Sequence, residues 1–93
     1  MAQSIVKIET NRVRVTEWRL LPGEQTGPHR HEYDYVVVPL TGGELTIEDS
    51  SGNTTKLVTT TGDAYVRPEG VEHNVLNLSS QEIRFTDIDL LER

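Results

Sequence analysis

The three histidines of the chain are spaced so that they could bind one metal ion. His29 and His31 lie two residues apart in the segment PHRHEYDY, and His73 follows the segment RPEGVE further along the chain. Residues i and i+2 of a strand project from the same face, so His29 and His31 are expected to point toward one place. With His73 they would form a facial set of three nitrogen ligands that leaves coordination positions open. These residue types predict metal-assisted chemistry without naming a substrate.

The composition restricts both the ligands and the partners of such a site. The absence of cysteine excludes disulfides, thiolate ligands and thiol nucleophiles. A formal net charge of −6, with 15 acidic and 9 basic side chains and no basic run, argues against nucleic acid as a partner. The longest apolar stretch, YVVVPL, is too short to span a bilayer, and the N-terminus lacks the features of a signal peptide. We therefore expect no membrane partner and a cytoplasmic location.

The hydrophobic pattern predicts an all-β fold. Apolar residues recur at every second position, as in Val13 and Val15 or Ile83 and Phe85, and no long stretch shows a helical stripe. Short segments rich in glycine, proline, asparagine, aspartate and serine separate these runs. Strands are expected near residues 4–9, 12–20, 32–39, 43–49, 54–60, 63–67, 73–78 and 82–90. With 93 residues, the chain is expected to form one domain, residues 1–93, of the sandwich or barrel type.

The strand expected around the first two histidines determines which neighbours share their face. If both imidazoles point inward, parity also places Tyr33, Tyr35 and Val37 inward and Asp34 outward, unless a bulge shifts the register. A Gly-Pro pair precedes the first histidine, and a Pro-Glu-Gly turn precedes the third. A ligand on a rigid turn loses little conformational entropy when a metal binds, so both turns favour a preformed site.

These spacings resemble the two sequence motifs of the cupin superfamily. The matching positions are Gly23, His29, His31 and Gly42 in the first motif, and Gly62, Pro68, Gly70, His73 and Asn77 in the second. Where the superfamily has a metal-binding glutamate, this chain has Tyr35. The stretch HRHEYDYVVVPLTGGEL further resembles the BauB-like group of small cupins. The resemblance implies a single-domain jelly-roll β-barrel.

The resemblance also implies that His29, His31 and His73 ligate one divalent transition metal near a mouth of the barrel. Iron, nickel, zinc, manganese and cobalt all suit three imidazoles, so the sequence does not choose among them. Because three neutral ligands leave the metal charge uncompensated, the site is expected to favour a small anionic ligand. All-histidine sites occur among cupins in iron-dependent dioxygenases. Tyr35, in place of the glutamate, is a candidate catalytic residue that would donate a hydrogen bond or a proton to a bound ligand.

Residues near the motifs have structural interpretations beside the functional ones. Tyr33 and Tyr35 are also strand-forming aromatics that suit a core or rim. Asp34 would replace the missing carboxylate only if a bulge turned it inward. Arg67 is either an anion-attracting group near the barrel mouth or an ordinary surface arginine, and Trp18 is expected in the core or a subunit interface.

Two functions from different classes are compatible with this reading. The first is a metal-dependent enzyme that acts on a small anionic or carbonyl compound by Lewis-acid polarisation or O₂ activation, including a dioxygenase-type reaction. The second is a non-catalytic module that binds a small ligand or metal; a silent cupin whose histidines only pack the barrel is the remaining alternative. The small core and the alternating segment SIVKIETNRVRVTEW, which could add a strand to a partner's sheet, predict a homodimer.

Overall fold

The structure is a computed structural model that describes residues 1–92, and this range contains nine β-strands and no helix. The strands are β1 (Gln3–Glu9), β2 (Val13–Leu20), β3 (His29–Arg30), β4 (Tyr35–Pro39), β5 (Gly43–Asp49), β6 (Thr54–Thr59), β7 (Tyr65–Arg67), β8 (Glu72–Leu76) and β9 (Ile83–Leu90). Among the described residues, nothing forms a helix able to cross a membrane. The all-β prediction is confirmed.

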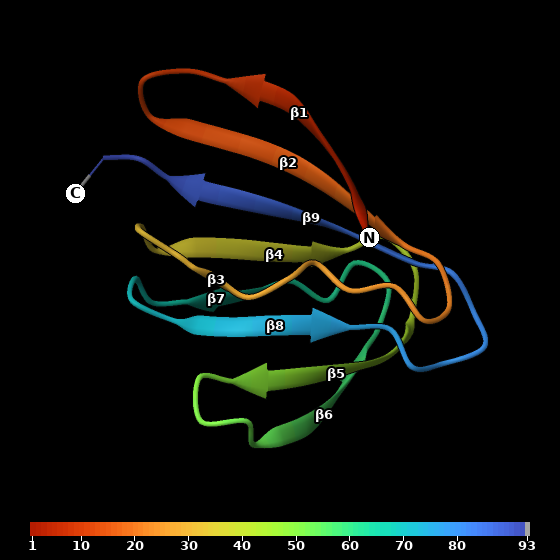
Figure 1. Cartoon of the computed structure of the whole chain (residues 1–93). Coiled ribbons are helices and arrows are strands. Elements are labelled where there is room, and N and C mark those ends of the chain that lie inside the picture. Colours follow the sequence, from red (N-terminus) through yellow and green to blue (C-terminus); the bar gives the residue numbers. More distant parts are fainter. Residues whose placement is uncertain (93) are drawn as a thin grey trace.

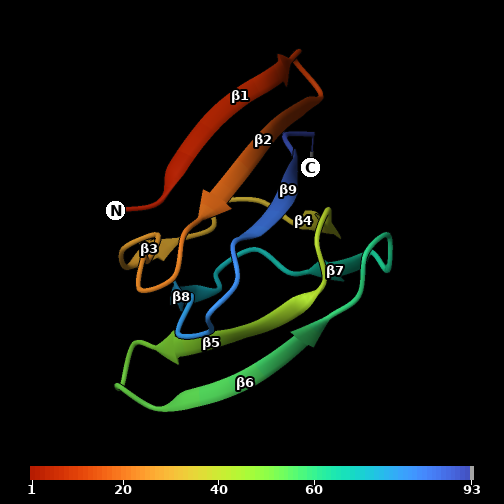
Figure 2. The same ribbon diagram turned by 90° about the vertical axis from the view of Figure 1, so that its right-hand side faces the viewer.

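The strands form two antiparallel sheets that face each other as a jelly-roll barrel. The five-stranded sheet has the order β1-β2-β9-β4-β7, and the four-stranded sheet has the order β3-β8-β5-β6. In Figure 1, β1, β2, β9 and β4 lie above β8, β5 and β6, and Figure 2 shows the two groups separated across the barrel. Strand β9 lies between β2 and β4, so Val13 is paired with Leu90 despite their distance in sequence.

The core fills the space between the two sheets. Its buried apolar residues are Leu20, Tyr35, Val37, Leu45, Val75, Ile83 and Phe85. Burial alternates along β4 and β9, which agrees with the period-two pattern of the sequence. In β9 the same phase continues to Asp87, so a carboxyl group that is only 9 % exposed occupies a core position.

The segment around the first two histidines is not one continuous strand, and the strand expected over residues 32–39 begins only at Tyr35. Strand β3 consists of only two residues, and β4 begins at Tyr35. His31 lies in the connection between them, where the chain passes from the four-stranded to the five-stranded sheet. The premise that His29 and His31 share one strand face was therefore wrong, because the chain must leave the first sheet to enter the second.

Hydrogen bonds from a neighbouring turn fix the backbone of His31 in place of a sheet ladder. The His31 amide donates to the Val71 carbonyl at 2.9 Å, and its carbonyl accepts from the Gly70 amide at 2.8 Å. Gly70 has a φ of +92°, a conformation that glycine adopts without strain. The turn of the second cupin-like motif therefore fixes the backbone of His31, which belongs to the first motif.

Asn77 connects the two sheets near the start of β9. Its side chain is fully buried, and its Nδ2 donates to the carbonyls of Leu20 and Gln81 at 2.9 and 2.7 Å. Its Oδ1 accepts from the amide and hydroxyl of Ser79 at 3.0 and 2.6 Å. These bonds fix the turn that leads into the strand carrying Asp87.

Strand β1 forms an edge of the five-stranded sheet, and all seven of its residues are exposed. Its apolar side chains Ile5, Val6 and Ile8 are 58, 52 and 53 % exposed. Figure 2 shows β1 on the outer side of β2, away from the four-stranded sheet. The chain therefore presents an unpaired, partly apolar strand edge.

Candidate metal centre

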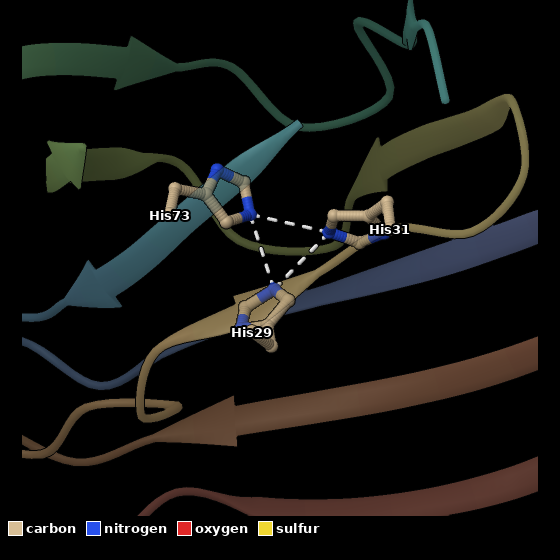
Figure 3. Close-up of side chains that lie close together, drawn as sticks. All are labelled: His29, His31 and His73. Atoms are coloured by element: carbon tan, nitrogen blue, oxygen red, sulfur yellow. Dashed lines mark hydrogen bonds between the residues drawn. The ribbon is translucent and has the colours of Figure 1, made fainter. Parts of the chain in front are cut away.

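The three histidine side chains, called here the histidine cluster, point their Nε2 atoms toward one another (Figure 3). The Nε2 atom of His29 lies 3.1 Å from those of His31 and His73, and the last two are 3.2 Å apart. The rings are steeply inclined to each other, with interplanar angles of 73°, 75° and 88°. The sequence prediction that these residues come together is met in a nearly equilateral triangle of nitrogens.

A metal ion suits this donor set better than mutual hydrogen bonding does. An Nε2 atom of a neutral imidazole is either a donor or an acceptor, so at least two of three facing atoms have the same role and cannot bond each other. Three imidazole nitrogens about 2.0–2.1 Å from one metal lie about 3.0 Å apart at right angles and about 3.4 Å apart at tetrahedral angles. The observed separations of 3.1–3.2 Å fall between these values. The cluster could therefore hold a metal ion.

The main-chain carbonyl of Gly27 sets the orientation of the His29 ring. Nδ1–H of His29 donates to this oxygen at 2.8 Å, so that Nε2 is the nitrogen available to bind a metal. Gly27 has a φ of +89°, and its amide donates to Oδ1 of Asn74 at 3.0 Å. The turn before β3 is thus tied to β8, the strand that carries the third histidine.

Strand pairing brings the first and third histidines together. His29 and His73 lie directly opposite each other in the antiparallel β3–β8 pair. Directly opposed residues have Cβ atoms about 5 Å apart, so both rings reach the same point. The next pair, Arg30 and Glu72, is exposed, with Nε and Oε1 3.9 Å apart.

Burial keeps two of the imidazoles in the metal-binding form. Burial, together with the neighbouring His29 and His73, lowers the pKa of His31 to about 4. Burial is also the main cause that lowers the pKa of His73 to about 4, with contributions from His29 and Arg67. Both rings are therefore neutral near pH 7, as metal ligation requires.

Tyr35 stacks on one ring of the cluster. Its ring centroid lies 3.7 Å from that of His31, with 12° between the planes, and its side chain is buried. Burial raises the pKa of the phenol, and the negative charge of Asp87 raises it further. Tyr35 is therefore a neutral hydroxyl-bearing side chain in direct contact with a candidate ligand.

A cavity of about 390 Å³ lies between the sheets beside the histidine cluster. His29 and His73 reach it from the four-stranded sheet. Seven lining residues belong to the five-stranded sheet. Five of them, Trp18, Tyr35, Tyr65, Phe85 and Asp87, are called here the aromatic wall, and the other two are Val37 and Arg67. The volume of the cavity is that of a small-molecule site.

Two neighbours of the first motif stay outside the cavity. The Asp34 side chain is exposed, and its Oδ1 accepts from the Glu69 amide at 2.8 Å, so Asp34 does not replace the missing glutamate. Tyr33, expected to face inward, is half-buried and is not among the cavity-lining residues. The chain leaves the sheet between His31 and Tyr35, so strand parity does not extend across this segment.

Two other residues considered from sequence do line the cavity. Arg67 is exposed, and its guanidinium carbon lies 4.7 Å from the centroid of the Tyr65 ring. Trp18 packs against the core, as one of its two predicted positions requires, and it also lines the cavity as part of the aromatic wall.

Asp87 is a candidate functional residue that sequence reasoning missed. Burial and, to a smaller extent, the charge of Asp89 raise its pKa to about 7, against the lowering effect of a hydrogen bond from the Trp18 side chain. A carboxyl group with such a pKa exchanges a proton near neutral pH. The sequence does contain an indication of this position. In the segment IRFTDID, Asp87 follows Ile83 and Phe85 at alternate positions, so a strand places all three side chains on the same face.

Comparison with known proteins agrees with this fold. Residues 16–89 match the sequence model of the cupin domain. The chain is 47 % identical over 85 residues to the β-alanine degradation protein BauB of Pseudomonas aeruginosa, which covers 91 % of this chain and 88 % of that relative.

Solved structures give the same result. A cupin domain from Bordetella pertussis Tohama I superimposes with a TM-score of 0.91 at 50 % identity, covering 96 % of this chain and 92 % of that one. An RmlC-like cupin from Methanocaldococcus jannaschii, 18 % identical, superimposes with a TM-score of 0.80 over 97 % of this chain and 80 % of its own, a likeness of fold alone.

Proposed function

The chain belongs to the cupin family, and from this premise we propose that it is a metal-dependent enzyme acting on a small anionic or carbonyl compound. The observation that carries the proposal is the convergence of three Nε2 atoms, 3.1–3.2 Å apart, at the side of a cavity of about 390 Å³. A cluster that only packed the barrel would have no reason to face its nitrogens toward one another.

His29, His31 and His73 would hold one divalent transition metal, with iron, nickel, zinc, manganese and cobalt as the candidates. When bound, such an ion supplies Lewis-acid polarisation of a carbonyl group or activation of O₂ for a dioxygenase-type reaction. The three protein ligands are neutral, so an anionic group of the substrate would compensate the charge at the site.

Tyr35 is the proposed catalytic residue beside the cluster. Its ring is held against His31 by stacking, and its phenol is neutral, so it would donate a hydrogen bond or a proton to an oxygen of the substrate. Apolar side chains of the same cavity, including Val37, Leu45 and Phe85, would exclude water and strengthen that hydrogen bond.

The name of one relative supports a class of test compounds. BauB is named for β-alanine degradation, and β-alanine is a short carboxylic acid. We propose that short-chain carboxylic acids and their carbonyl derivatives are the first compounds to examine with this chain.

Metal analysis of protein purified without an affinity tag tests the proposal. We expect about one transition metal per chain in the wild type and its loss in His73→Ala with the fold intact. Glu72→Ala is the matched control, because Glu72 precedes His73 in β8 but its side chain is exposed. Unchanged metal content in His73→Ala would show that the site is misassigned.

Activity measurements then separate the enzyme from the alternative, a non-catalytic binding module. Oxygen uptake and product analysis would be followed on metal-loaded protein with diketones, thiols and short-chain acids. Consumption of a compound by the wild type and not by His73→Ala supports the enzyme, whereas saturable binding without turnover across the panel favours the binding module.

A further inference from the structure

We propose that the cavity contains a second subsite, on the wall opposite the histidine cluster, that binds a primary ammonium group through Asp87 and the surrounding aromatic rings. The subsite is the aromatic wall defined above, and all of its residues belong to the five-stranded sheet. It is built from residues other than the candidate metal ligands, so it can be tested on metal-free protein.

The sheet register places Asp87 at the centre of this wall. Strand β9 lies between β2 and β4, and Asp87 is paired with Thr16 on one side and Val37 on the other. Phe85 precedes it by two residues and therefore projects from the same face. Trp18 is paired with Phe85, which puts the indole diagonally across from Asp87.

Asp87 lacks a positively charged partner. Its carboxyl is 9 % exposed and accepts a hydrogen bond from the neutral side chain of Trp18. Among residues 1–92, no lysine, arginine or histidine forms an ion pair with it. The nearby Asp89 is paired with Arg14 at 3.7 Å. A buried carboxylate without a cation is costly, so a cationic ligand would be favoured at this position.

The aromatic residues of the chain are concentrated around this carboxyl. The only tryptophan, the only phenylalanine and two of the three tyrosines line the cavity. Aromatic faces attract ammonium groups, and a carboxylate beside them adds a charge-assisted hydrogen bond. Arg67 shows that one of these rings attracts a cation, because its guanidinium lies 4.7 Å from the Tyr65 ring centroid.

The two walls together define a substrate class, an inference that rests on the proposed function. A ligand whose carboxylate compensates a metal at the histidine cluster and whose ammonium group reaches Asp87 is a short amino acid. Because the cluster and Asp87 lie on opposite sheets, its two charged groups would be separated by carbon atoms, as in an ω-amino acid, and not joined to one carbon.

Trp18 provides the readout, since it is the only tryptophan and contacts Asp87. Metal-free protein, prepared with a chelator, would be titrated with propylammonium and with propionate while the fluorescence of Trp18 is recorded. We expect saturable binding of propylammonium, weaker binding of propionate, and a loss of about tenfold in ammonium affinity for Asp87→Asn. Asp89→Asn is the matched control, because it removes a charge from the same strand outside the cavity lining.

A second variant keeps the test valid if Asp87→Asn does not fold. Tyr65→Leu removes the half-buried ring of β7 and is expected to weaken propylammonium binding about threefold. Equal affinity for propylammonium in the wild type and in whichever of these two variants folds, or an equal loss in Asp89→Asn, would overturn the subsite.

Metal-loaded protein separates this inference from the proposed function. There we expect β-alanine to bind more tightly than propionate in the wild type, and the two acids to bind equally in Asp87→Asn. Ammonium binding by a protein that takes up no metal would leave the subsite standing and refute the metal site. Metal uptake with no preference of the wild type for β-alanine over propionate would refute the subsite alone.

Discussion

The ring of Tyr35 lies flat on the imidazole of His31, with 3.7 Å between centroids and 12° between planes. Tyr35 is the first residue of β4, and His31 is in the connection that leads into it. The residue that stands in the place of the usual glutamate therefore packs on a candidate ligand, and it belongs to the sheet opposite the other two histidines.

Replacing Tyr35 in two ways would separate its packing from its hydroxyl group. Tyr35→Phe keeps the ring, so we expect unchanged metal content and a lower kcat once a substrate is known. Tyr35→Ala removes a buried ring and is expected to lower the free energy of unfolding by about 3–5 kcal/mol. Urea unfolding and metal analysis check both variants. A Tyr35→Phe protein that turns over at the wild-type rate would leave the hydroxyl without a catalytic role.

Metal binding is expected to stabilise the barrel. An ion that binds only the folded chain adds about 2.7 kcal/mol to the free energy of unfolding at a free concentration of one hundred times Kd. For a domain of this size we expect the Tm to rise by about 10–20 °C. Thermal unfolding followed by circular dichroism, with chelator and with each candidate metal, checks this. His73→Ala should show no rise; a rise equal to the wild type would place the metal elsewhere.

The buried carboxyl of Asp87 should make stability depend on pH. Its pKa is raised from 3.8 to about 7, so the folded state binds a proton more tightly than the unfolded state. Its contribution is therefore fully present below about pH 4 and is lost as the pH rises toward and through 7. The groups that act on it or share its side of the cavity are Trp18, Tyr35, Tyr65, Arg67 and Asp89.

Asp87→Asn removes this titration. We expect the variant to gain stability relative to the wild type between pH 5 and pH 8, measured by urea unfolding of metal-free protein. Asp89→Asn is the comparison within the same strand and should show a smaller change, because Asp89 is more exposed and paired with Arg14. A stability difference between wild type and Asp87→Asn that is the same at both pH values would show that Asp87 does not titrate in this range.

We predict that the chain forms a homodimer through the edge of β1. Ile5 and Ile8 are more than half exposed on an unpaired strand edge, which a second copy could cover by adding a strand. Ile5→Lys combined with Ile8→Lys should yield a monomer in light scattering at micromolar concentration, without loss of the fold. Val58→Lys, at an exposed position of the edge strand β6, is the control. A monomer mass for the wild type would contradict the prediction.

The strands and the histidine cluster could be predicted from the sequence, but the backbone arrangement that brings the histidines together could not. Spacing and the cupin-like motifs identified His29, His31 and His73, and the structure brings their nitrogens together. The expected shared strand face is absent, because the fixed position of His31 comes from hydrogen bonds to Gly70 and Val71. Such bonds form between segments far apart in sequence, and strand periodicity does not report them.

The buried position of Asp87 was hard to predict, because the apolar residues of this strand change from odd-numbered to even-numbered positions next to it. Ile83 and Phe85 predict one inward face, whereas Ile88 and Leu90 predict the other. The structure has no bulge between β2 and β9, and all eight residues of β9 stay in register. Because β9 pairs without interruption with both neighbouring strands, the inward face set by Ile83 and Phe85 continues to Asp87, and its carboxyl group points into the barrel.

The central position of β9 has a consequence for how the molecule folds. Its pairing with β2 requires segments as distant as Val13 and Leu90 to meet before the five-stranded sheet exists. Contacts of such long range make folding slow, on the order of milliseconds to seconds. Until that encounter the two sides of the cavity do not face each other, so a partly unfolded molecule would have no enclosed space in which to hold a small ligand.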